Sequence, residues 1–130
     1  MATAPAYAAT PVAWPGLVPG TADTSNTVPT HVTSLGSAGA NGTKITQIDI
    51  IPTATVVAGI VNVFAYDGTT YHLHEPVTIA AATVSTTAAP VKQSFYYDNL
   101  VLPNGWSLAV SNTVSSNVSI IEVNAYGASL

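Results

Sequence analysis

From about residue 28 to its C-terminus, the chain alternates short runs of β-branched and aromatic residues with clusters of Gly, Pro, Asn and Asp. Such runs predict β-strands, and the clusters between them predict turns. No stretch shows the apolar spacing of three to four residues that an amphipathic helix requires. The pattern therefore predicts an all-β domain over residues 28–130, with strands at 30–37, 44–53, 60–66, 69–80, 91–102, 106–112 and 117–127.

The predicted strand at 44–53 indicates which side chains share a face. Successive side chains of a strand point to opposite sides of the sheet. Strict alternation places Ile48 and Ile50 on one side, and Ile45, Gln47 and Asp49 on the other. An equally regular alternation runs through 117–127.

The turns between the strands predict antiparallel pairing. Asp67-Gly68 is a strong hairpin sequence, because both residues tolerate the positive φ of a type I′ turn. It joins 60–66 to 69–80, and Pro103-Asn104-Gly105 provides a second tight turn. Seven or eight strands of this length predict an antiparallel β-sandwich, either jelly-roll or immunoglobulin-like, and leave the topology open.

Residues 1–27 differ from the rest because they are rich in proline. Proline fixes φ and donates no amide, so we expect an extended N-terminal arm rather than a helix or a central strand. The arm carries apolar side chains that a solvated linker has little use for, and it is expected to lie along a partner subunit or along its own body. A disordered tail is the alternative. The interface candidates in the arm are Tyr7, Trp14, Leu17 and Val18. Deletion of 1–27 is expected to leave the sandwich folded.

Charge is scarce throughout the chain. Charged residues make up 6% of it and the net charge is −4, whereas an ordinary soluble domain is roughly 25% charged. The two cations are Lys44 and Lys92, and phosphate neutralisation needs a patch of several cations. Binding to nucleic acid and polybasic contact with a membrane are therefore not expected. Because interspersed charge keeps proteins apart in solution, the composition instead predicts a working state that is an assembly.

The sequence has neither a signal-peptide pattern nor cysteine. The N-terminus lacks a basic segment followed by an unbroken apolar run, so we expect no signal peptide and synthesis in the cytoplasm. The chain has no cysteine, which excludes disulfides, thiolate metal sites and a cysteine nucleophile.

The sequence YHLHEP, residues 71–76, holds the most conspicuous ionisable side chains. His72 and His74 share one face of a strand, and Glu75 is expected to point away from them. A metal site needs a third and usually a fourth ligand, and His31 is the remaining histidine. We therefore expect no metal, and interpret His72 and His74 as outer-face residues of a hairpin or as a subunit contact. If they face a second copy, assembly should weaken at mildly acidic pH.

Catalytic motifs are also missing from the sequence. The carboxylates are scattered singly, and no nucleophile elbow, phosphate loop or His-Glu-x-x-His segment occurs. We expect no enzymatic activity and no cofactor. The alternative is a glycan-binding module, in which aromatic side chains form a sugar-stacking platform from Tyr66, Tyr71, Tyr96, Tyr97 and Trp106.

The order of four segments resembles a group of small virion proteins encoded near the capsid genes of tailed bacteriophages. The segments are GTADTSNTVPTHVTSLGSAGANGTKITQIDI (20–50), GIVNVFAYDGTTYHLHEPVTI (59–79), LVLPNGWSLAVSN (100–112) and IIEVNAYG (120–127). The resemblance to head decoration (cement) proteins implies a non-enzymatic β-sandwich on the outer surface of the head. It also implies the major capsid protein as partner and self-association as a homo-oligomer, commonly a trimer. A phage tail or fibre component is a second alternative.

Overall fold

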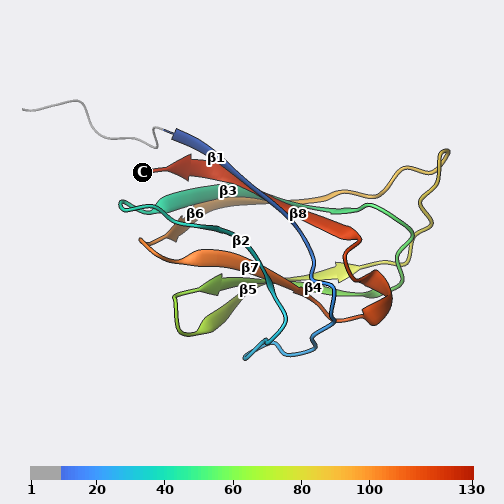
Figure 1. Cartoon of the computed structure of the whole chain (residues 1–130). Helices are drawn as coiled ribbons and strands as arrows, with labels where there is room; N and C mark the ends of the chain where they lie inside the picture. Colours follow the sequence, from blue (N-terminus) through green and yellow to red (C-terminus); the bar gives the residue numbers. More distant parts are fainter. Residues whose placement is uncertain (1–9) are drawn as a thin grey trace, which may run out of the picture.

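The computed structural model describes residues 10–130, which form two packed antiparallel β-sheets (Figure 1). The first sheet has the strand order β1-β8-β3-β6, and the second has the order β2-β7-β4-β5. A 3₁₀ turn, η1 (Ser115–Asn117), precedes the last strand. The strands are β1 (Thr10–Leu17), β2 (Thr33–Ser37), β3 (Thr43–Pro52), β4 (Gly59–Tyr66), β5 (Tyr71–Ile79), β6 (Gln93–Leu102), β7 (Ser107–Asn112) and β8 (Ile121–Ser129).

The strands pair as nested hairpins. β4 pairs with β5, β3 with β6, β2 with β7, and β1 with β8, all antiparallel. Eight strands folded in this way over two sheets form a jelly roll. The predicted all-β antiparallel sandwich is confirmed. Of the two expected topologies, jelly-roll and immunoglobulin-like, the strand order matches the jelly roll.

The predicted boundary between an arm (1–27) and a sandwich (28–130) does not match the observed strands. β1 lies on the arm side of it, and all eight of its residues are in register with β8. Val18 follows β1 and is 1% exposed in the core. The chain is extended here, as expected. Its prolines are compatible with this strand because β1 lies at the edge of the sheet. From residue 10 onward the predicted arm lies along its own body, and Tyr7 lies outside the described residues.

The core lies between the sheets and is built mainly from Ile, Val and Leu. One expected face assignment is wrong: Ile45, Ile48 and Ile50 are all 0% exposed. The cause is a β-bulge at Thr46, where the pairing register shifts between Ile45 and Gln47. One extra residue in a strand reverses the alternation beyond it, so Ile45 and Ile48 both reach the core.

The two sides of the sandwich close differently. On one side, Trp14 of β1 lies against Gly36 of β2, so closely that a Cβ on Gly36 would be 2.5 Å from the indole. On the other side, β5 and β6 are connected through side chains, since Gln93 Nε2 donates to the Thr78 carbonyl at 3.1 Å.

Each edge strand is interrupted. Val18 donates its N–H to the Ile121 carbonyl at 2.9 Å, which shows that the even-numbered residues of β1 form the hydrogen bonds to β8. The odd-numbered residues therefore direct their backbone polar groups away from β8. Pro11 and Pro15 occupy two of these outward positions and have no N–H to offer there. β2 is short and bulged after Ser34. β5 contains Pro76 and a bulge, and β6 is bulged where its register with β3 shifts. Among the strands of residues 10–130, no edge offers a long unbroken row of backbone groups.

A loop of residues 19–32 crosses the outer face of the second sheet (Figure 1). The Asn62 side chain donates to Asn26 at 3.0 Å, and Asp23 N–H donates to the Asn112 carbonyl at 2.8 Å. Tyr71 packs edge-on against Phe64 on this face. The outer-face residues that are buried there are Asn62, Phe64, Ala109 and Ser111.

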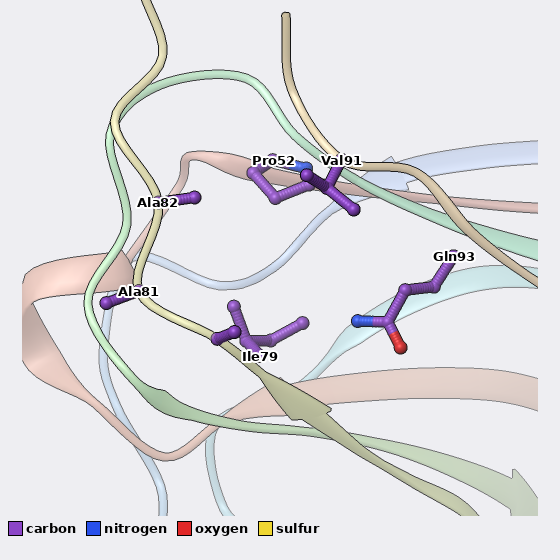
Figure 2. A pocket seen from close by; sticks show the side chains of 7 residues that line it. Pro52, Ile79, Ala81, Ala82, Val91 and Gln93 are labelled. Carbon is purple, nitrogen blue, oxygen red and sulfur yellow. The ribbon is translucent and has the colours of Figure 1, made fainter.

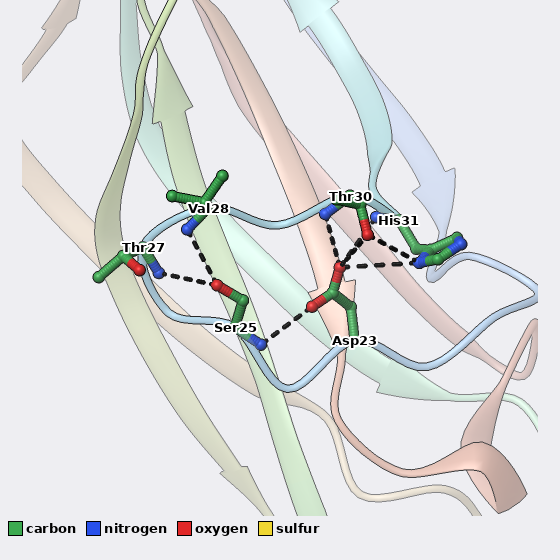
Figure 3. A network of polar contacts seen from close by, with 6 residues as sticks. All are labelled: Asp23, Ser25, Thr27, Val28, Thr30 and His31. Atoms are coloured by element: carbon green, nitrogen blue, oxygen red, sulfur yellow. Dashed lines mark hydrogen bonds and ion pairs between the residues drawn. The ribbon is translucent and has the colours of Figure 1, made fainter.

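Asp23 holds this loop in shape (Figure 3). Its carboxylate accepts backbone N–H groups of Ser25 at 2.9 Å, Thr30 at 2.6 Å and His31 at 2.9 Å. The Thr30 hydroxyl adds a further bond at 3.2 Å. These donors, with the Ser25 amide first, lower the pKa of Asp23 to about 2.

We expect Asp23→Asn to lower the thermal midpoint at pH 7 and to have little effect near pH 2. A carboxyl group with a lowered folded-state pKa contributes stability above its usual pKa, and this stability is lost as pH falls through about 2. An amide oxygen accepts weaker bonds than a carboxylate, so the neutral-pH cost should be about 1–2 kcal/mol. Thermal unfolding followed by circular dichroism at both pH values measures this. An equal difference at the two pH values would contradict the expectation.

Candidate docking surfaces

Two histidines lie on the side of the sandwich between β5 and β6. The His72 ring stacks on Trp106, with ring centroids 5.9 Å apart and an interplanar angle of 14°. His72 Nε2 lies 3.0 Å from Asp67 Oδ2 and can donate to it. Asp67 belongs to the β4–β5 turn, and its other oxygen accepts N–H groups of Thr69 and Thr70. Both the imidazole and the turn are therefore fixed by one carboxylate.

His74 lies at a bulge in β5. Val63 pairs with Glu75, whereas Phe64 pairs with Leu73, so His74 is the extra residue. The prediction that Glu75 points away from the histidines is wrong, because the bulge breaks the alternation on which it depended. The rings of His74 and Tyr97 are 5.1 Å apart, and the Tyr97 hydroxyl donates to Glu75 Oε1 at 3.0 Å. We call His72, His74, Glu75, Tyr97 and Trp106 the histidine rim.

The electrostatics of the rim stabilise its geometry. The pKa of Asp67 is lowered to about 2, chiefly by the Thr70 amide and then by the bond to His72. Burial, and then Glu75, raise the pKa of Tyr97. Tyr97 is therefore a protonated donor at neutral pH, and it ties β6 of the first sheet to β5 of the second.

The contacts of the rim fix the orientation of His72. Its ring is held by Asp67 on one side and by the Trp106 indole on the other. Within residues 10–130, no group of three or more His, Cys, Asp or Glu side chains is placed to hold a metal ion.

The aromatic residues considered for sugar stacking are distributed over three surfaces. Tyr66 and Tyr71 stack on each other at 4.2 Å, on the second sheet. Tyr97 and Trp106 belong to the histidine rim, and Tyr96 projects from the first sheet with 74% exposure. They do not form one platform.

The outer face of the first sheet is a surface of strands that carries many exposed side chains in residues 10–130. The side chains opposite to the core on β1, β8, β3 and β6 align in rows across the sheet, because their pairing registers coincide. The rows are Leu17/Glu122/Ile51, Pro15/Asn124/Asp49/Ser94, Ala13/Tyr126/Gln47/Tyr96 and Pro11/Ala128/Lys44/Val101.

A small apolar cavity of about 130 Å³ lies where β5 ends and β6 begins (Figure 2). It is much smaller than the roughly 300–1,000 Å³ of typical ligand pockets, so it suits a single small apolar group. Its lining residues are Pro52, Ile79, Ala80, Ala81, Ala82, Val91 and Gln93.

The interface candidates from the sequence separate into buried and exposed residues. Val18 is a core residue, which leaves it no surface for a partner, and Trp14 packs partly buried against the core. Leu17 is 43% exposed, and His72 and His74 are exposed. The rows of the first sheet were missed, although the exposed positions of Tyr96 and Tyr126 lie in strands that the sequence predicted.

Comparison with known proteins adds no assignment, since no family model, curated protein or solved structure matches the chain. Among residues 10–130, no helix has the length and apolar character needed to cross a membrane.

Proposed function

We propose that this chain is a non-enzymatic decoration, or cement, protein of a tailed bacteriophage. It binds the outer surface of the head, contacts the major capsid protein and further copies of itself, and stabilises the shell through these contacts. Two grounds support the proposal: the resemblance of the four sequence segments, and the surface chemistry of the folded chain.

The observation that carries the proposal is the uncovered outer face of the first sheet. Its exposed positions include Ala13, Pro15, Leu17, Tyr96 and Val101, and the charged side chains in the same rows are Lys44, Asp49 and Glu122. Neutral small and aromatic side chains bury without the desolvation cost of charges, so this face is suited to contact with protein.

The charge of the chain favours the outside of a head. An acidic protein without arginine would be repelled by packaged DNA, whereas the outer surface imposes no such penalty. Jelly rolls occur in both viral capsid proteins and lectins, so the fold agrees with this role without selecting it. The scattered aromatic residues favour the structural role over glycan binding.

Cryo-electron microscopy of the intact virion tests the proposal. We expect density for the jelly roll on the outside of the head, in contact with the major capsid protein. Addition of the purified chain to heads that lack it should give co-sedimentation and raise the temperature at which the heads open. Density confined to the tail, or failure to bind such heads, would overturn the proposal.

A further inference from the structure

We propose that the outer face of the first sheet pairs with the same face of a second copy, across a twofold axis that lies between the faces and perpendicular to the strands. The inference specifies one partner, a second copy, for the proposed assembly role. The pairing itself needs only the isolated chain, so it can be tested without heads. Its argument starts from the four rows, which the strand registers define.

The twofold axis reverses the rows. Each strand of one copy lies over the same strand of the other copy and runs in the opposite direction. The row of Pro11 in one copy therefore lies over the row of Leu17 in the other. In the same way, the row that contains Tyr126 and Tyr96 lies over the row that contains Asn124 and Ser94. The contact is isologous, as twofold interfaces are.

The shapes of the two central rows are complementary under this operation. Tyr96 is 74% exposed and Tyr126 is 38% exposed, so their row stands out from the sheet. The neighbouring row is lower, because Asp49 is 6% exposed and Ser94 is short. Each tyrosine of one copy therefore lies over a smaller side chain of the other.

The charges of the face select the same orientation. Lys44 lies in the row at one end, and Glu122 lies in the row at the other end, on the neighbouring strand β8. Seven residues of strand separate the two rows by roughly 20 Å, so the charges do not pair within one chain. The twofold brings each Lys44 near Glu122 of the other copy, whereas parallel stacking would place like charges together.

The buried Asp49 carboxylate at the centre of the face has hydrogen-bond donors near it in the pair. Gln47 Nε2 already donates to Asp49 Oδ1 of its own chain at 2.8 Å. In the pair, Gln47 lies over the Asp49 of the other copy, whose carboxylate has further acceptor positions. The buried carboxylates therefore face amide donors and not apolar side chains.

The size of the face suits a specific but moderate contact. Four strands about 4.8 Å apart and eight residues of about 3.3 Å give roughly 500 Å² per copy. Two copies bury on the order of 1,000 Å², near the lower limit for specific interfaces. The outer face of the second sheet does not compete, because the loop of residues 19–32 crosses it.

Sedimentation equilibrium of the full-length chain, between about 1 and 200 µM, tests this pairing. We expect a monomer–dimer equilibrium at pH 7. Tyr96→Arg should abolish the dimer without unfolding, because the side chain is exposed. A monomer at all concentrations, or a dimer unaffected by Tyr96→Arg, would overturn the inference.

A charge swap tests the orientation. Lys44→Glu and Glu122→Lys should each weaken the dimer on the order of tenfold, since two symmetry-related pairs become repulsive. The double variant should restore it, and Lys92→Glu, on an exposed residue outside the rows, is the matched control. Weakening that the double variant does not reverse would exclude the proposed twofold. Head binding is assayed separately, so a chain that dimerises without binding heads refutes the proposed function and leaves this inference standing.

Discussion

A chain that begins at residue 28 is expected not to fold into the native sandwich. This replaces the expectation that the sandwich stays folded when residues 1–27 are deleted. The truncation removes β1, which is in register with β8 over all eight of its residues, together with the core residue Val18. It also removes Asp23, which shapes the loop over the second sheet.

The energetic cost of this truncation is comparable with the whole stability of a domain. Loss of a fully packed Trp side chain costs about 3–5 kcal/mol in typical cores, and Trp14 of β1 packs, partly buried, against the core and Gly36 of β2. Val18 and the β1–β8 hydrogen bonds add to this, whereas typical domains are stable by only about 5–15 kcal/mol. The truncation also turns β8 into a free edge, which favours aggregation.

Circular dichroism and urea unfolding of two truncated chains measure the effect. Deletion of 1–27 should abolish the cooperative transition, and deletion of 1–9 is the matched control because it leaves every described strand in place. A cooperative transition of the 28–130 chain at the full-length midpoint would show that β1 is dispensable.

Gly127→Ala is expected to destabilise the sandwich more than other single methyl additions to it. A Cβ at Gly127 would lie 1.9 Å from the Lys44 carbonyl oxygen and 2.9 Å from Ile45 Cα. These are backbone atoms of β3 beside the bulge at Thr46, and β8 is held between β1 and β3. The strands must separate locally, and we expect a loss of about 3 kcal/mol.

Thermal unfolding of this variant provides the measurement. A loss of that size lowers the midpoint by roughly 10 °C for a domain of this length. Gly39→Ala is the control, because a Cβ there meets nothing within 4 Å and Gly39 has an ordinary φ. Equal midpoints for the two variants would mean that the close approach of β3 and β8 relaxes at little cost.

The sequence was sufficient to predict strands at the positions of β2 to β8, because most of them are runs of β-branched or aromatic residues, with turn residues between the runs. The β4–β5 hairpin was predicted correctly from Asp67-Gly68, but its turn is not type I′. Gly68 has a positive φ of 98°, whereas Asp67 does not, and four residues, 67–70, join the two strands. β1 was missed as a strand of the sandwich because Pro11 and Pro15 lower strand propensity. An edge strand tolerates them where their missing N–H groups face away from the partner, which only the pairing reveals.

Two bulges account for the face assignments that failed. Alternation predicts faces only while every residue has a partner, and the extra residues Thr46 and His74 break it. Local sequence does not specify such a bulge, since it depends on the neighbouring strand. The rows on the first sheet were unpredictable for the same reason: residues as distant as Ala13 and Tyr96 fall in one row only through the registers of three strand pairs.

The interruptions on all four edge strands restrict how copies of this molecule can grow together. Strand-by-strand addition from one molecule to the next would generate an open-ended fibril, and the prolines and bulges at the edges block that route. An isologous contact through a face instead closes on itself and stops at two copies. For a chain with so few repelling ions, this restriction at the edges of residues 10–130 favours contacts of limited extent, which the proposed assembly role requires.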